Sequence, residues 1–268
     1  MIANLLGELV TAYQSPQAPT VLFAWVNAFA YALQIYYDFS GYSDMAIGLG
    51  HMLGFSFPEN FRYPFCSRNI TEFWRRWHMT MSFWVRDYVY IPLGGNRCSR
   101  KRWIFNVMVV WMLTGLWHGA AWNFVAWGIC YGLLLLAEKF FLNRLLDKAP
   151  KALRHLYVTV VIAVSFVIFS GVGAKGMIAD MGALFGANGL AFWSKETSYY
   201  VSGYLIALAV AIFGATPVLK NLFAKLHENE KTCKVLNVLE PIFHVVLLLI
   251  VTAYFVDGSF SPFLYFRF

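Results

Sequence analysis

Two histidines lie in segments of this chain that are otherwise apolar and aromatic. His118 belongs to the run Leu116-Trp117-His118-Gly119, and His78 ends the run Phe73-Trp74-Arg75-Arg76-Trp77-His78. An imidazole is the side chain best suited to take a proton from a hydroxyl nucleophile, and ionisable residues inside a membrane are functional by default. We therefore interpret His118 as a candidate general base. A histidine that only satisfies a backbone carbonyl at a helix turn is the alternative.

Several neighbours are candidates to support the two histidines. Trp117 and Asn123 flank the small residues 119–121, which leave room for a substrate. At 100° per residue, one helix stripe carries Arg75, His78, Ser82 and Arg86. An arginine fork recognises phosphate, but lipid headgroups are anionic as well, so these arginines either bind a substrate anion or anchor the helix. His78 is a second candidate catalytic residue, with a merely polar helix face as its alternative.

Asp38 and Asp44 place two carboxylates among apolar neighbours, with Ser40 and Ser43 between them. A charge at membrane depth costs about 2.5 to 3.5 kcal/mol, so both aspartates should face protein or water. Six residues apart, they would differ by about 240° around a continuous helix, which argues against a carboxylate dyad. We interpret them as mainly structural supports of the site.

No other catalytic or metal-binding pattern is recognisable. The four cysteines make no Cys-x-x-Cys pair, so neither a metal site nor a disulfide is inferred. A Gly-rich phosphate loop, a zinc spacing and a nucleophile elbow are also lacking. We expect no metal and no permanently bound cofactor.

The composition indicates a membrane protein. Of 268 residues, 59% are hydrophobic, 19% aromatic and 13% charged, whereas a soluble domain has about 25% charged residues. The net charge of +7 requires no nucleic-acid partner, because the basic residues cluster between apolar runs, as in cytoplasmic loops. We expect an all-α, polytopic transmembrane bundle in a lipid bilayer.

The N-terminal part of the chain contains one unusually long apolar segment. Residues 1–19 form a short lead that ends in a proline-bearing loop and lacks the features of a signal peptide. As a helix, Val21 to Phe57 would be longer than about 50 Å, so it must break, tilt or extend beyond the hydrocarbon core. Asp38 to Asp44 is the expected break.

Thr71 to Tyr90 is predicted to be one amphipathic helix, interfacial or re-entrant, with Asn69 or Thr71 as its cap. The apolar face would carry Phe73, Trp77, Met81, Trp84 and Tyr88.

A helical hairpin is predicted next. Trp103 to Leu142 has no charge before Glu138 and would be about 60 Å long as one helix, so the chain must turn near Gly115 to Ala121. His118 lies about 24 Å from Arg102 along the first arm, inside the far part of the hydrocarbon core.

The remaining spans are predicted at Val158 to Val172, Tyr199 to Leu219 and Ile242 to Val256. Gly173 to Thr197 and the basic segment Lys220 to Lys234 are expected to be loops, and the aromatic tail 261–268 is expected at an interface. With the basic connections on one side, the His118 turn lies toward the outside. We treat residues 1–268 as a single membrane domain.

Four motifs, in matching order, resemble the membrane-bound O-acyltransferase family. They are Tyr36 to Asp44, Phe73 to His78 with Arg86-Asp87-Tyr88, Ile91 to Asn96, and Leu116 to Gly119. The Ile91 to Asn96 run and the Pro262 to Phe268 ending are similar to the branch of the alginate O-acetyltransferase membrane subunit. The resemblance covers about residues 20–268, the C-terminal half of a usual member.

The resemblance implies an acyltransferase in which His118 is the catalytic histidine and His78 the second characteristic one. The protein would lie in the bacterial inner membrane. The donor, acetyl-CoA or an equivalent carrier, would reach His118 from the cytoplasmic side. Acetyl would pass to an exported cell-surface polysaccharide such as alginate, through a separate extracytoplasmic partner protein. D-alanyl or peptidoglycan acyl transfer by the same family is the alternative.

Two readings from other classes remain open. A membrane transporter or channel would line its path with the same buried polar groups, but it would be expected to show repeats with broken helices in corresponding positions, and no second copy of the Asp38 or His118 motif is found. A non-catalytic scaffold that recruits a partner enzyme is the third possibility.

Overall fold

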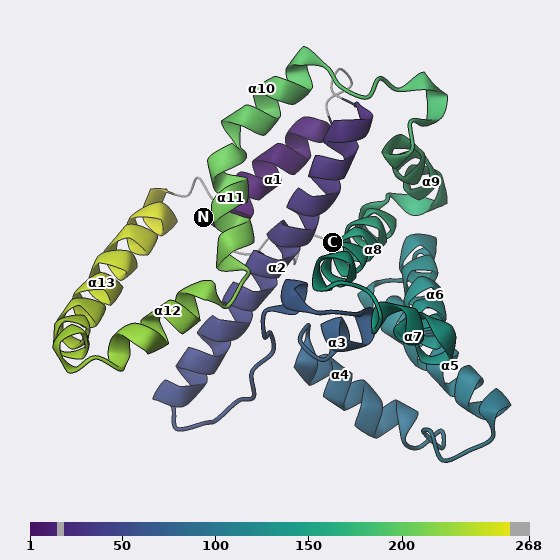
Figure 1. Ribbon diagram of the computed structural model, residues 1–268, viewed down its shortest axis with the longest axis horizontal. Coiled ribbons are helices and arrows are strands. Elements are labelled where there is room, and N and C mark those ends of the chain that lie inside the picture. Colours follow the sequence, from purple (N-terminus) through teal and green to yellow (C-terminus); the bar gives the residue numbers. More distant parts are fainter. Residues whose placement is uncertain (15–18, 258–268) are drawn as a thin grey trace.

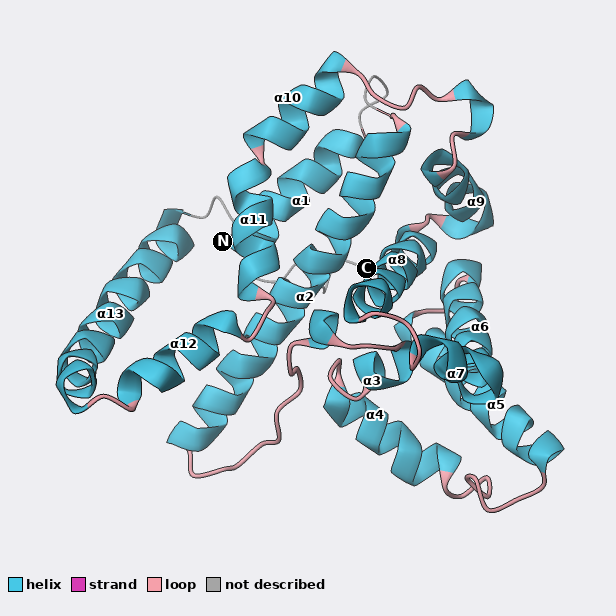
Figure 2. Ribbon diagram, viewed as in Figure 1, coloured by secondary structure: helices cyan, strands magenta, loops and turns pink. Residues whose placement is uncertain are grey.

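The computed structural model describes residues 1–14 and 19–257 (Figure 1). Every regular element in these residues is a helix (Figure 2), which confirms the all-α class. In chain order the elements are α1 (Ile2–Tyr13), α2 (Val21–Met52), η1 (Pro64–Cys66), α3 (Ile70–Trp74), α4 (Met79–Val85), η2 (Arg86–Tyr90), α5 (Arg100–His118), α6 (Trp122–Ala137), η3 (Glu138–Leu142), α7 (Asn143–Leu146), α8 (Lys151–Ser170), α9 (Gly173–Leu184), η4 (Ala187–Gly189), α10 (Lys195–Gly203), α11 (Leu205–Gly214), α12 (Val218–His227) and α13 (Glu230–Asp257).

Helix α2 is the axis of the molecule. It runs from the top of Figure 1 toward the lower left, and α1, α8 and α11 pack along it. The α5–α6 hairpin packs on α8, and α12 and α13 stand away from the bundle at the lower left. The main buried cluster joins α1, α2, α3, α6 and α8 through side chains that include Leu6, Phe23, Phe73, Tyr131 and Ile162. This core fixes α3 and α6, which flank the two histidines, relative to α2.

Among the described residues, three helical segments are long and apolar enough to cross a membrane: Trp122–Leu146, Lys151–Ser170 and Glu230–Tyr254. They include most of the spans predicted at 158–172 and 242–256. The span predicted at 199–219 overlaps the α10–α11 pair, which is bent by 52° and would be a fourth crossing if it forms one span. The chain is therefore a membrane protein.

The predicted break at Asp38 to Asp44 is wrong, because α2 continues without interruption for 32 residues. No proline interrupts this helix, and a polar side chain in it finds a partner without a change in the backbone: Ser43 accepts a hydrogen bond from Asn60 (Nδ2 to Oγ, 2.9 Å). At about 1.5 Å per residue the helix is about 48 Å long. Its last turns leave the core, so that Met45 and Leu49 are exposed.

The predicted single helix over Thr71 to Tyr90 is also wrong. Helices α3 and α4 are separate, and His78 lies between them with a left-handed backbone (φ 44°). Asn60 replaces the hydrogen bonds that a continuous helix would have made: its carbonyl accepts the N–H of Met79 (3.0 Å), and its side chain accepts the N–H of Thr80 (3.2 Å). The break therefore depends on a loop that is distant in sequence.

Part of the prediction for this segment is confirmed. The side chain of Asn69 caps α3 by accepting the N–H of Glu72 (2.7 Å). The predicted apolar face is buried only in part: Phe73, Trp77 and Met81 are buried, whereas Trp84 and Tyr88 are exposed.

Two segments expected to be loops are helical. Helix α9 lies within Gly173 to Thr197, and α12 lies within the basic segment that follows α11. Ala183 and Leu184 of α9 are buried against α2 and α8, so tertiary packing overrides the low helix propensity of the glycines in this segment. In α12 the apolar residues recur at a helical spacing between the lysines. The high charge of the segment led to the prediction of a loop there.

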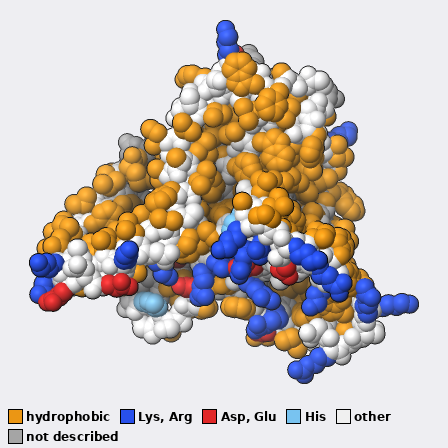
Figure 3. All heavy atoms as spheres, viewed as in Figure 1, with side chains coloured by type: hydrophobic (Ala, Val, Ile, Leu, Met, Phe, Trp, Pro, Cys, Tyr) orange, Lys and Arg blue, Asp and Glu red, His pale blue; other side chains and the backbone are white. Residues whose placement is uncertain are grey.

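Lys and Arg side chains gather along the lower edge of the face seen in Figure 3, and few lie at its top. This distribution is expected if the basic connections lie on one side of a membrane. The sidedness and the single membrane domain over residues 1–268 stay predictions. The proline-bearing loop at 15–18 and the aromatic tail at 261–268 fall outside the described residues.

Candidate functional site

The α5–α6 hairpin carries His118 at the end of its first arm, as predicted. Gly115 and Gly128 bring the two helices together backbone to backbone, since a Cβ on either glycine would lie 2.3 Å from a carbonyl oxygen of the facing helix, that of Phe124 or Trp111. Small residues are the usual means of close helix packing in membranes. One turn after Gly115, His118 is therefore held tightly against α6.

Gly119 permits the turn that follows. Its φ of 152° with ψ of 158° is a conformation that only glycine adopts easily. A Cβ at this position would also lie 2.8 Å from the ring of Phe124. A larger residue at position 119 would have to move either the peptide after His118 or this ring.

The ring of His118 lies in an aromatic box built by α6 and α8. The ring centroids of Trp127 and Phe169 are 5.3 and 5.0 Å from that of His118, both edge-on, and that of Phe124 is 6.1 Å away. Asn123 is buried, and its Nδ2 donates to the carbonyl of Phe169 (2.8 Å), which ties the start of α6 to the end of α8. This predicted supporting residue therefore holds the wall of the box.

His78 is held by Asn60 and by α2. Its Nδ1 lies 3.1 Å from Oδ1 of Asn60, and its ring meets that of Phe39 edge-on at 4.7 Å. Oδ1 of the buried Asn60 also accepts the N–H and the hydroxyl of Thr80 (3.2 and 2.8 Å), while Nδ2 donates to Ser43. One amide thus joins α2, the loop before α3 and the start of α4.

These contacts determine the tautomer of neutral His78. The N–H of Thr80 needs an acceptor, so the atom of Asn60 that it meets is the oxygen. Nδ1 of His78 then carries the proton and donates to that oxygen, and Nε2 keeps its lone pair. His78 can therefore accept a hydrogen bond or a proton through Nε2 while it stays anchored through Nδ1.

The two histidines lie near enough to interact electrostatically, although they come from different elements. A cavity of about 310 Å³ lies between α4, η2 and α5. Three members of the predicted polar stripe line it despite the break in the helix. Its lining residues include Arg75, Ser82, Arg86 and Thr114, the last of these one turn before His118.

Two predicted supporting residues lie at the edge of this region. Arg86 is exposed and forms an ion pair with its neighbour Asp87 (Nε to Oδ1, 2.7 Å). Trp117 is 65% exposed, and its ring centroid lies 6.2 Å from that of Trp84. This contact connects the end of α5 to α4.

The two aspartates lie on α2, and their supporting role stays a prediction. Asp38 is half-buried and Asp44 exposed, and their spacing on one continuous helix puts them on different faces. Within residues 1–14 and 19–257, no three His, Cys, Asp or Glu side chains are grouped so that they could hold a metal ion. The four cysteines are free thiols.

Glu138 holds the start of α3, a role that sequence reasoning missed. This fully buried carboxylate accepts the backbone N–H groups of Ile70 (2.6 Å) and Thr71 (2.8 Å). It also accepts the hydroxyls of Thr71 (2.6 Å) and Tyr157 (3.2 Å). The first N–H groups of a helix have no partner within it, so η3 supplies one from another part of the chain. Glu138 thereby anchors the segment that ends in His78.

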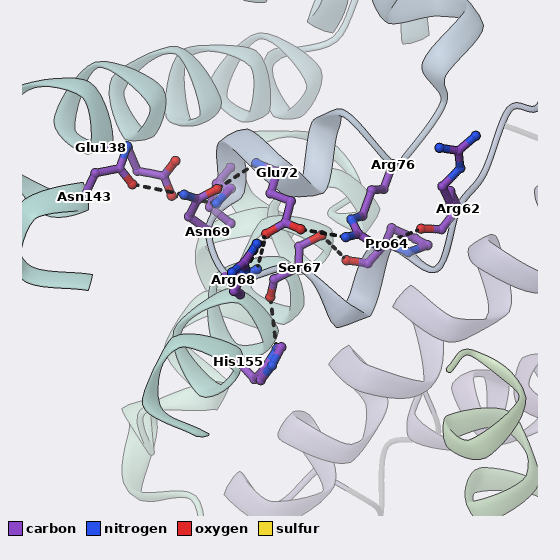
Figure 4. A network of polar contacts seen from close by, with 11 residues as sticks. Arg62, Pro64, Ser67, Arg68, Asn69, Glu72, Arg76, Glu138, Asn143 and His155 are labelled. Carbon is purple, nitrogen blue, oxygen red and sulfur yellow. Dashed lines mark hydrogen bonds and ion pairs between the residues drawn. The ribbon is translucent and has the colours of Figure 1, made fainter. Parts of the chain in front are cut away.

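A second carboxylate, Glu72, organises the polar side of α3 (Figure 4). It forms ion pairs with Arg68 (3.3 Å) and Arg76 (2.7 Å). Burial acts to raise the pKa of Glu72, but the hydrogen bonds and charges of these arginines outweigh it, so the pKa lies below its usual range. Beside it, Asn69 donates to Asn143 of α7 (3.1 Å). The ionised Glu72 keeps both arginines in place.

Asn60 and Glu138 are the polar anchors of His78 and α3 that the sequence analysis did not single out. From the sequence, Asn60 is interpreted only as a loop residue between two prolines, because asparagine is common in turns. In the sequence, Glu138 is the first charged residue after a long apolar run. A lone carboxylate next to a membrane-spanning segment requires a partner. That requirement is the one signal that points to Glu138.

Comparison with known proteins places both histidines in a matched region. A model of the membrane-bound O-acyltransferase family matches residues 5–179. The chain is similar to the probable alginate O-acetylase AlgI of Azotobacter vinelandii, with 47% identity over 171 residues that cover 63% of this chain and 34% of the relative.

Two further relatives are each 36% identical to this chain over the matched residues. The probable alginate O-acetylase AlgI of Pseudomonas putida is 36% identical over 290 residues, which cover 100% of this chain and 58% of the relative. The peptidoglycan O-acetyltransferase of Helicobacter pylori is 36% identical over 184 residues, which cover 67% of this chain and 35% of the relative. The matched part of these relatives is thus about a third to somewhat over half of their length.

Proposed function

The chain belongs to the membrane-bound O-acyltransferase family, and we propose that it takes part in transferring acetyl groups to an exported cell-surface polysaccharide such as alginate. The names of the relatives support this substrate class, since two are probable alginate O-acetylases and one is a peptidoglycan O-acetyltransferase. Because these relatives are bacterial, the proposed location is the bacterial cytoplasmic (inner) membrane, crossed several times.

The observation that carries the proposal is the position of His118 in its aromatic box at the turn of the α5–α6 hairpin. His118 takes the proton of an acceptor hydroxyl as the hydroxyl oxygen attacks the carbonyl carbon of an acetyl thioester. A C–O ester bond forms, the C–S bond breaks, and the proton passes from His118 to the leaving thiolate. His78 orients the reacting group through Nε2, which its contact with Asn60 leaves free to accept.

The donor in this proposal is acetyl-CoA or an equivalent acetyl carrier, which acts as a substrate and not as a resident cofactor. It approaches from the cytoplasmic side, where the basic connections are predicted. The acceptor approaches from the opposite side, where the proposal includes a separate extracytoplasmic partner protein that completes transfer to the polysaccharide.

A vesicle assay tests the proposal against transport. The full chain is reconstituted in lipid vesicles with acetyl-labelled coenzyme A inside, and with alginate oligosaccharides and the extracytoplasmic partner protein outside. We expect label to appear as an alkali-labile ester on the oligosaccharide at a rate that depends on the chain. Release of intact labelled donor without ester formation would contradict acyl transfer and favour a transporter.

A further inference from the structure

A second cavity, of about 680 Å³, lies between α3, α7 and the start of α8. Its lining is polar and strongly basic, in contrast to the mostly apolar lining of the cavity between α4, η2 and α5. Two carboxylates, Glu72 and Asp147, face six basic side chains, which are Arg62, Arg68, Arg75, Arg76, Lys139 and Arg154. In Figure 3, Lys and Arg side chains gather over this part of the molecule.

Half of these basic side chains form ion pairs, with two carboxylates between them. Arg62 forms an ion pair with Glu59 (2.7 Å), and Glu72 holds both Arg68 and Arg76. Figure 4 shows Arg68 and Arg76 drawn toward Glu72 from opposite sides. Glu72 therefore organises two guanidinium groups on the cavity wall but leaves the rest of its positive charge unbalanced.

The other three, Arg75, Lys139 and Arg154, form no ion pair with any carboxylate in the described residues. Nε of Arg154 is buried and has no hydrogen-bond partner there. A buried N–H without a partner is unusual in native structures. The cavity thus has three basic side chains on its wall that no carboxylate of the described residues pairs with.

The chemistry that fits is a phosphate ester. Several guanidinium and ammonium donors around one cavity suit an anion with three or four oxygen acceptors, which phosphate offers and a single carboxylate does not. The volume exceeds what one inorganic ion needs, so an organic part can enter with the phosphate. Basic cavities between membrane helices on the cytoplasmic side are known to take phosphate headgroups.

We propose that the cavity between α3, α7 and α8 binds a phosphate ester, with Arg154, Lys139 and Arg75 as the residues that receive the anion. Arg75 also lines the cavity of about 310 Å³ that extends beside α5 to Thr114. The phosphate belongs either to a soluble donor such as coenzyme A or to a membrane lipid, and the soluble source rests on the proposed function.

Binding measurements on the purified full chain in detergent test the proposal. Arg154→Gln and Lys139→Gln each remove one donor, and each is expected to weaken coenzyme A binding about tenfold or more, because a charge-assisted hydrogen bond is lost. Lys101→Gln is the matched control: it removes an exposed cation at the start of α5, outside the cavity, and should change affinity less than about twofold. Two variants are used so that a folding defect in one leaves the other informative.

The experiment uses two probes to distinguish a soluble phosphate ester from a lipid phosphate ester. Loss of coenzyme A binding in both cavity variants supports a soluble ester, whereas loss of binding only to vesicles that contain phosphatidylglycerol supports a lipid ester. Equal affinity of cavity variants, control and unmodified chain for both probes would overturn the proposal. These measurements record binding and not acyl transfer. The binding result can therefore be interpreted even if the proposed acyl transfer is not observed.

Discussion

His118→Ala is expected to lower the rate of acetyl transfer by about 100- to 10,000-fold, the usual contribution of a general base, while the chain still inserts into the membrane. The reason is local. The imidazole is the one proton acceptor that the aromatic box of Trp127 and Phe169 offers at the end of α5 among the described contacts. The initial rate of ester formation in membranes with matched amounts of protein measures the effect.

His244→Ala is the matched control for this substitution. His244 also lies in an apolar helix, but its Nδ1 is 2.8 Å from the carbonyl of Glu240 in the same helix. That is the purely structural arrangement considered as the alternative for His118. Transfer should remain within about twofold of the unmodified rate for His244→Ala. Full activity in His118→Ala would remove His118 from the mechanism.

Glu138→Ala is expected to destabilise the protein by about 3 kcal/mol or more, because each buried donor left without a partner costs about 1–3 kcal/mol. The substitution leaves four donors without their acceptor: the N–H groups of Ile70 and Thr71 and the hydroxyls of Thr71 and Tyr157. In a protein of this size, 1 kcal/mol corresponds to about 2–4 °C in Tm. We therefore expect thermal unfolding in detergent to begin at least about 6 °C lower.

Two companion variants make this measurement specific. Glu138→Gln keeps the shape and one carbonyl oxygen but replaces an acceptor with a donor, so its Tm should fall between those of the alanine variant and the unmodified chain. Glu59→Ala removes an exposed carboxylate that pairs only with Arg62, a contact worth about 0–1 kcal/mol. Equal Tm values for Glu138→Ala and Glu59→Ala would show that Glu138 does not anchor α3.

Local pattern was enough to predict some elements from the sequence. An apolar segment too long for one crossing, interrupted by small residues, predicts the α5–α6 hairpin and the place of His118 at its turn. Asn69 before a helical pattern predicts the cap of α3. These predictions succeed because the features that decide them lie within a few residues of each other.

Tertiary contacts explain what sequence reasoning missed. The break before His78 is stabilised by Asn60, eighteen positions earlier, and the start of α3 by Glu138, sixty-eight positions after Ile70. Neither residue type is unusual where it stands. Conversely, the polar segment Asp38 to Asp44 does not break α2, and its Ser43 finds a partner in Asn60 without a change in the helix. The roles of the candidate site residues stay proposals.

The central claim is that His78 and His118 act in one site, and a double-mutant comparison in the vesicle assay tests it most directly. Transfer rates are measured for His78→Ala, His118→Ala and the double variant. Residues that act as a unit give strongly non-additive losses, so the double variant should lose about as much activity as His118→Ala alone. A double variant whose loss equals the product of the two single losses would contradict the shared site.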